Sequence, residues 1–110
     1  MIYEIALLPI HKEHIENFRN AFAEVTPLLS RAKGYHGHML AQGIETPEQL
    51  NLIVRWQSLE DHKGFEASED HQVFMARLEE YFSEEPTVYH IEDAAFTTGE
   101  DADQNSFFAK

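Results

Sequence analysis

Residues 51–82 constrain the fold most, because one strand pattern leads directly into two separately capped helix patterns. The strand pattern is Asn51–Gln57, which is rich in apolar and β-branched residues. Ser58 followed three residues later by Asp61 resembles a capping box, in which each residue satisfies a free backbone N–H group. This pair predicts a short helix that begins at Ser58 and reaches about Glu66.

A second helix start follows almost at once. Ser68, followed by two acidic residues, combines an N-cap with negative charge at the positive end of the helix dipole. The apolar residues that we expect on the buried side of this helix are Phe74, Leu78, Tyr81 and Phe82. Pro86 ends the pattern, because proline cannot continue a helix.

The first part of the chain predicts one strand and one longer helix. Ile2–Leu8 reads as a strand that stops at Pro9. From about Lys12 the apolar residues recur at helical steps, at Ile15, Phe18, Phe22, Val25 and Leu29. Pro27 removes one backbone hydrogen bond, so we expect a kink or a break near Thr26.

The remaining strands complete an α+β fold. Residues 35–44 and 87–96 are both strand-like, and the first of them joins the strand at Asn51 through a Thr46-Pro47 connection. The order βαββαβ predicts a ferredoxin-like sandwich, with a four-stranded antiparallel sheet and helices on one face. We assign residues 1–96 to this domain. Residues 97–110 are read as an acidic tail, either disordered or an arm that packs Phe107 and Phe108 on a partner subunit.

Composition excludes several classes of partner. The chain has 20 acidic and 8 basic side chains, a formal net charge of −12, so binding to nucleic acid or to a membrane surface is not expected. Cysteine is absent, which leaves no thiolate chemistry. No leader-like or membrane-spanning apolar segment is visible, so we expect a cytoplasmic protein.

The strands are apolar on both faces, which predicts a homodimer. Ile2, Ala6 and Leu8 share one face of the first strand, but the residues between them, Tyr3, Ile5 and Leu7, are at least as apolar. Helices can cover only one face of the sheet, so the other face needs a second cover. A second subunit's sheet would supply it.

Several histidines and one arginine are candidate site residues. Strand periodicity puts His36 and His38 on one face of the second strand, yet two histidines are too few for a metal site, and none is predicted. On the third strand the apolar Trp56 face should meet the helices, so Arg55 points into the space between sheet and partner. There its guanidinium could hold a substrate oxygen or pair with an acid. His90 is expected to look away from the helices.

His62 is the candidate general base. It lies at the start of the short helix, where we expect the lip of a pocket, and an imidazole can move protons near neutral pH. Opposed effects of burial and of neighbouring acids should leave it titrating near neutrality. The alternative is a half-buried histidine that ties the helix to a strand. His71 should be a surface residue.

The motifs together resemble the antibiotic biosynthesis monooxygenase family over roughly the first 95 residues. The resemblance rests on Trp56-Gln57-Ser58, on the run from His62 through Phe65 to Ser68, and on residues 33–38 and 86–90. It implies a dimeric α/β barrel. It also implies a small-molecule enzyme, although the family includes cofactor-free oxygenases, haem degraders, isomerases and members without known activity.

Three function hypotheses follow from this resemblance. The first is a cofactor-independent monooxygenase that acts on a small phenol or hydroquinone, with His62 and His38 as catalytic residues and Arg55, His36 and His90 binding the substrate. The second is a ligand-binding or stress-related module without chemistry. The third is an isomerase or degrader of a small metabolite. Haem is not expected, because Phe65 and Met75 occupy positions where the haem-degrading branch needs tryptophan and histidine.

Overall fold

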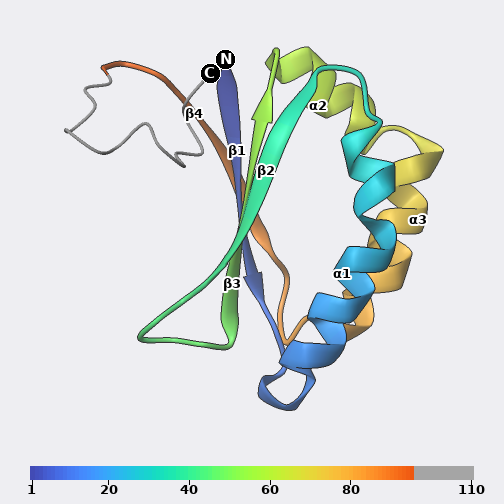
Figure 1. Ribbon diagram of the computed structural model, residues 1–110, viewed down its shortest axis with the longest axis vertical. Coiled ribbons are helices and arrows are strands. Elements are labelled where there is room, and N and C mark those ends of the chain that lie inside the picture. Colours follow the sequence, from blue (N-terminus) through green and yellow to red (C-terminus); the bar gives the residue numbers. More distant parts are fainter. Residues whose placement is uncertain (96–110) are drawn as a thin grey trace.

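The computed structural model describes residues 1–95, which form one sheet and one layer of helices (Figure 1). In chain order the elements are β1 (Ile2–Pro9), a 3-10 turn (Lys12–His14), α1 (Ile15–Ser30), β2 (Tyr35–Gln42), β3 (Gln49–Trp56), α2 (Leu59–Glu66), α3 (Glu69–Leu78), a second 3-10 turn (Glu79–Tyr81) and β4 (Thr87–Glu92). In Figure 1, α1 and α3 run side by side along one face of the sheet, and α2 lies near the N-terminal end of β1. The predicted βαββαβ order is confirmed.

The sheet has four antiparallel strands in the order β2-β3-β1-β4. The N-terminal strand β1 is central, since it pairs with β3 along one side and with β4 along the other. Each residue of β1 therefore shares its face of the sheet with the residues paired to it on β3 and β4. This pairing confirms the ferredoxin-like sandwich and decides which side chains can meet.

The helix-facing side of the sheet builds the core. Trp56 and Val54 on β3 are fully buried, and Leu52 shares their face. They pack with Phe18, Ala21, Phe22, Val25 and Leu29 of α1, Phe65 of α2, and Phe74 and Leu78 of α3. The prediction that the Trp56 face meets the helices is correct. Burial of such side chains is the main stabilising contribution, at about 1.5–3 kcal/mol for each large apolar group.

Helix starts follow the sequence signals closely. The Ser58 and Ser68 side chains each accept a hydrogen bond from a backbone N–H three residues later, both at 3.2 Å. These caps let α2 and α3 follow each other with only Ala67 and Ser68 between them. Of the kink or break expected near Thr26, the break is not observed, because α1 continues through Pro27 to Ser30. The Thr26 hydroxyl donates to the Phe22 carbonyl oxygen at 2.7 Å inside the same turn.

A β-bulge in β2 changes the faces of two histidines. The register with β3 shifts between Tyr35 and Gly37, and Gly37 has a φ of 132°, which favours glycine. The extra residue puts His38 opposite Val54, on the helix face, while His36 contacts Gln57 at 3.1 Å on the other face. The prediction that His36 and His38 share a face is therefore wrong, because strict alternation fails at a bulge.

The sheet face without helices is apolar, as expected from the strand pattern. At its centre, Ile53 of β3 lies between Ile5 of β1 and Met39 of β2. Tyr89 and Ile91 on β4 are about half exposed, at 48% and 49%. Among residues 1–95, no helix lies over this face (Figure 1).

Two sequence expectations fall partly outside the described residues. The last strand ends at Glu92 rather than at residue 96, and the assignment of residues 97–110 to a tail or arm lies beyond residue 95. Within residues 1–95, no helix is both long and apolar enough to cross a bilayer.

The bulge yields a test with a matched control. A Cβ at Gly37 would meet no atom within 4 Å, so Gly37→Ala probes only the positive φ and should destabilise the protein by about 1–3 kcal/mol. Gly64→Ala, in the exposed interior of α2 with equally open surroundings, should instead stabilise by roughly 0.5–1 kcal/mol. Urea unfolding measures both values. Equal effects of the two substitutions would contradict a glycine-dependent bulge.

Candidate active site

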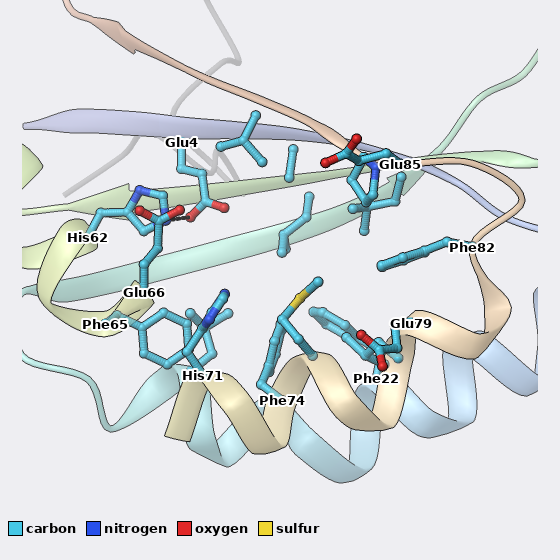
Figure 2. Close-up of a pocket in the computed structure, with 18 residues that line it drawn as sticks. Glu4, Phe22, His62, Phe65, Glu66, His71, Phe74, Glu79, Phe82 and Glu85 are labelled. Carbon is cyan, nitrogen blue, oxygen red and sulfur yellow. Dashed lines mark ion pairs between the residues drawn. The ribbon is translucent and has the colours of Figure 1, made fainter. Parts of the chain in front are cut away.

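A cavity of about 380 Å³ lies between the helix-facing side of the sheet and the helices. Its apolar wall comes chiefly from Phe22, Phe65, Phe74, Met75, Leu78 and Phe82. Its polar lining consists of Glu4, His62, Glu66, His71, Glu79 and Glu85. Figure 2 shows Glu4, His62 and Glu66 together at one end, with Glu79, Phe82 and Glu85 at the other. The cavity is large enough for a small aromatic molecule.

Glu4 is a buried carboxylate on the central strand. Its residue is 8% exposed, and it pairs across the sheet with Val54 on β3 and His90 on β4. The Trp56 indole Nε1–H donates to Glu4 Oε1 at 3.1 Å. Within residues 1–95 both polar partners of the carboxylate contact Oε1, which leaves Oε2 free to meet a molecule in the cavity.

His62 links α2 to three strands of the sheet through one imidazole ring. The Ser58 cap sets the start of α2, and one turn later His62 projects toward β1 with 2% of its surface exposed. Its Nε2 lies 3.1 Å from Glu4 Oε1, and its Nδ1 lies 2.7 Å from His90 Nε2. The ring stacks on Trp56 with centroids 5.2 Å apart. His62 therefore connects α2 to β1 and β4 through its two ring nitrogens and to β3 through the stack on Trp56.

Burial moves the pKa values of Glu4 and His62 in opposite directions. Desolvation raises the pKa of Glu4 to about 7; the Trp56 hydrogen bond lowers it and the charge of Glu66 adds to the rise. Desolvation lowers the pKa of His62 to about 4, against the attraction of Glu66. Both side chains are thus neutral in weakly acidic solution. The expectation that His62 titrates near neutrality is wrong, and Glu4 is the group that does.

His90 faces the helices, contrary to the expectation from strand apolarity. Because Glu4 and His90 are directly paired, both side chains project from the same face of the sheet. Tyr89 and Ile91 are more apolar but lie on the other face, which carries no helix. The prediction assumed that the more apolar side of β4 faces the helices. This assumption fails because the face without helices is apolar too.

The other predicted site residues do not reach this cavity. Arg55 lies on the opposite side of the sheet, paired with Tyr3, as the strand pattern indicates. His36 is on that side too. His38 is on the helix face, but its Nδ1 contacts the Tyr35 hydroxyl at 2.6 Å and its ring contacts Phe22, outside the cavity lining. Arg55 and His62 therefore cannot contact the same molecule in the cavity.

Of the six polar lining residues only His62 was predicted, and Glu4, Glu66, His71, Glu79 and Glu85 were not. Glu4 carried a usable signal, because it is the one acid on an otherwise apolar strand face with Ile2, Ala6 and Leu8. His71 was expected at the surface, yet it is partly buried against Phe65, and burial lowers its pKa. In the first turn of α3, His71 lines the cavity, and its ring contacts Phe65 of α2.

Metal and haem ligands are not evident among the described residues. No group of three or more His, Asp or Glu side chains in residues 1–95 has a geometry that could hold a metal ion. Phe65 and Met75, at the positions where a haem-degrading site needs tryptophan and histidine, line the cavity as apolar groups. These residues do not fit a histidine-ligated haem.

Comparison of the sequence with protein families gives one clear match. The family model "Antibiotic biosynthesis monooxygenase" matches residues 1–77. YczJ of Bacillus subtilis (strain 168), an uncharacterized protein, is 36% identical over 94 residues, which are 84% of this chain and 99% of YczJ.

Solved structures agree with this match. A proposed antibiotic biosynthesis monooxygenase from Bordetella bronchiseptica is 33% identical, with a TM-score of 0.82 over 86% of this chain and 97% of that chain. SnoaB from Streptomyces nogalater, a cofactor-independent oxygenase, is only 13% identical but has a TM-score of 0.75 over 86% of this chain and 94% of its own. The second likeness is one of fold.

The raised pKa of Glu4 predicts how Glu4→Gln changes stability. A pKa above the ordinary 4.5 means that the protonated side chain favours the folded state, an advantage lost as the pH rises through about 7. Gln keeps the shape without ionising. The unfolding free energy of the variant minus that of the native protein should therefore rise by about 3 kcal/mol from pH 4 to pH 8.

Urea unfolding at several pH values measures this gain. Glu80→Gln, at an exposed position, is the control for removing one negative charge from the chain. A stability difference for Glu4→Gln that stays constant with pH would show that Glu4 is not the titrating group.

Proposed function

Because the chain belongs to the antibiotic biosynthesis monooxygenase family, we propose that it is a cofactor-independent monooxygenase acting on a small phenol or hydroquinone. One observation carries the proposal: a buried carboxylate, Glu4, has a pKa raised to about 7 at the wall of an apolar cavity of about 380 Å³. A general base works best when its pKa lies near the operating pH, as it does here.

The proposed reaction begins with removal of one proton. Glu4 Oε2 takes the proton of the substrate hydroxyl, and the resulting anion is electron-rich enough to reduce dioxygen without a cofactor. A carbon–oxygen bond forms at the ring, and the resulting peroxide anion takes one proton to become a hydroperoxide. The O–O and C–H bonds then break, so that the products are one quinone carbonyl and one water. The protein supplies the base, the orientation and the exclusion of bulk water.

The lining of the cavity favours an uncharged substrate. Four carboxylates, Glu4, Glu66, Glu79 and Glu85, contribute to it, and no Lys or Arg does among the described residues. A phosphorylated or carboxylated molecule would meet like charges without a cation to hold it. A neutral phenol is acceptable, because it becomes an anion only after Glu4 has taken its proton.

His62 has a catalytic role in this proposal as the partner of Glu4. Its Nε2–H can donate to the ionised carboxylate at 3.1 Å, while stacking on Trp56 fixes the ring. His36, His38 and Arg55 have no part in it, because they lie outside the cavity lining. Isomerisation of an uncharged carbonyl metabolite would use the same base, but it would consume no oxygen.

We also propose that the functional unit is a homodimer that pairs the two open sheet faces. Ile53, Ile5 and Met39 form an apolar centre on that face. Exposed apolar patches of this kind are typical of interfaces. The proposal fits the strand pattern, in which both faces of β1 are apolar.

Sedimentation tests the dimer directly. The native protein should have a mass near twice 12.7 kDa, and Ile53→Glu should give a folded monomer, because it puts a charge at the centre of the apolar face. Val73→Glu, at a position on α3 that is 56% exposed, should leave the mass unchanged. A native monomer at micromolar concentration would contradict the proposal.

Oxygen uptake tests the activity. With a panel of naphthols and hydroquinones, the native protein should consume oxygen, and kcat/KM should rise as the pH increases through about 7, where Glu4 loses its proton. Glu4→Gln should lower kcat by about two to four orders of magnitude. Glu79→Gln, at the other end of the cavity, should retain most of the activity. Full activity of Glu4→Gln on a substrate that the native protein oxidises would show that another residue is the base.

A further inference from the structure

We propose that His90 is the outlet of a proton relay that runs from Glu4 through His62 to solvent. The relay rests on the proposed function, because it exchanges with solvent the proton that Glu4 takes from the substrate hydroxyl and that the peroxide anion later requires. It addresses a geometric problem. When a molecule fills the cavity, water is displaced from the exposed side of the carboxylate, and the proton needs another route.

The three side chains form a chain of suitable contacts. Glu4 comes from β1, His62 from α2 and His90 from β4. The two links are 3.1 Å from Glu4 Oε1 to His62 Nε2, and 2.7 Å from His62 Nδ1 to His90 Nε2. Both distances are within the range over which protons transfer along hydrogen bonds. His62 is 2% exposed, whereas His90 is an exposed residue, so the chain leads from the interior to the surface.

The proton positions balance along this chain. Once the carboxyl group has turned so that its protonated oxygen faces His62, Glu4 donates to His62 Nε2, and His62 in turn donates its Nδ1–H to His90 Nε2. Transfer moves the carboxyl proton to His62 Nε2 and the Nδ1 proton to His90 Nε2. His90 then releases the proton on its own Nδ1 to water. Each imidazole ends in the other tautomer, Glu4 is ionised again, and one proton has left the site.

Other ionisable groups near His62 do not offer the same exit. Glu66 Oε2 lies 3.7 Å from Nε2, the nitrogen that already faces Glu4. His71, on α3, influences His62 only through its charge. Among residues 1–95, His90 is the one hydrogen-bond partner of Nδ1. Since a relay through imidazole enters at one nitrogen and leaves at the other, the exit must be through His90.

The relay can be tested without a substrate by nitrogen-15 NMR of the full-length protein. Raising the pH through about 7 should switch His62 from the Nδ1–H to the Nε2–H tautomer in the same step in which Glu4 ionises. The exchange of the buried His62 ring proton with water is the second measurement. In the native protein this exchange should be faster than in variants that lack the His90 imidazole, although His62 is buried.

Variants of His90 should block the exit. His90→Gln can still hydrogen-bond to His62 but cannot pass a proton on, and His90→Phe can do neither. Both should slow exchange of the His62 ring proton by about two orders of magnitude, and added imidazole should restore the rate in His90→Ala. His11→Gln, which changes an exposed histidine outside the cavity lining, should leave the exchange rate unchanged. A merely structural role would loosen the site, so exchange in the His90 variants would become faster.

Exchange in the His90 variants that equals or exceeds the native rate would overturn the relay, as would a single His62 tautomer from pH 5 to pH 9. These results are independent of the oxygenase proposal, which depends on oxygen uptake by the native protein and by Glu4→Gln. If the relay is found but the native protein consumes no oxygen, the relay proposal stands and the site carries out a different proton-transfer reaction. Oxygen uptake without the relay would mean that the proton returns through the cavity.

Discussion

The structure depends on how a carboxylate is accommodated in the middle of an apolar core. An isolated buried charge costs several kcal/mol, so Glu4 needs compensation from the groups around it. Trp56 supplies an N–H donor and His62 supplies a ring nitrogen, both at 3.1 Å from the same oxygen. Compensation is incomplete, and the carboxyl group keeps its proton up to about pH 7. The fully buried Trp56, the short capped helix α2 and the pairing of β1 with β4 all meet at this group.

Much of the fold could be predicted from local signals. Ser58 and Ser68 are N-caps whose effect depends on residues three positions away, and strand alternation correctly assigned Trp56 to the core. The resemblance to the antibiotic biosynthesis monooxygenase family agreed with these local signals, because its motifs fall on the same caps and strands. Local chemistry of this kind is visible in a sequence window of a few residues.

The site was harder to predict, because it depends on contacts between distant strands. The faces of His36 and His38 depend on one bulge, which a two-residue period cannot anticipate. The direction of His90 depends on its partner Glu4, which lies 86 positions earlier and had been treated as part of an apolar strand. His62 was identified, but its pKa was not, because burial by Trp56 and β1 outweighs the nearby acids of its own helix.

The cavity wall is divided between two kinds of element. The groups that we propose to transfer protons are held by backbone pairing or stacking: Glu4 and His90 by the sheet, and His62 by Trp56. By contrast, Phe74, Met75 and Leu78 all belong to α3 and contribute shape, and within residues 1–95 none of them is hydrogen-bonded to that chain of three side chains. Substitutions at these three apolar residues can therefore change which molecule the cavity accepts while the contacts among Glu4, His62 and His90 stay in place. Such a division lets related chains diverge in substrate through one short helix, with the sheet unchanged.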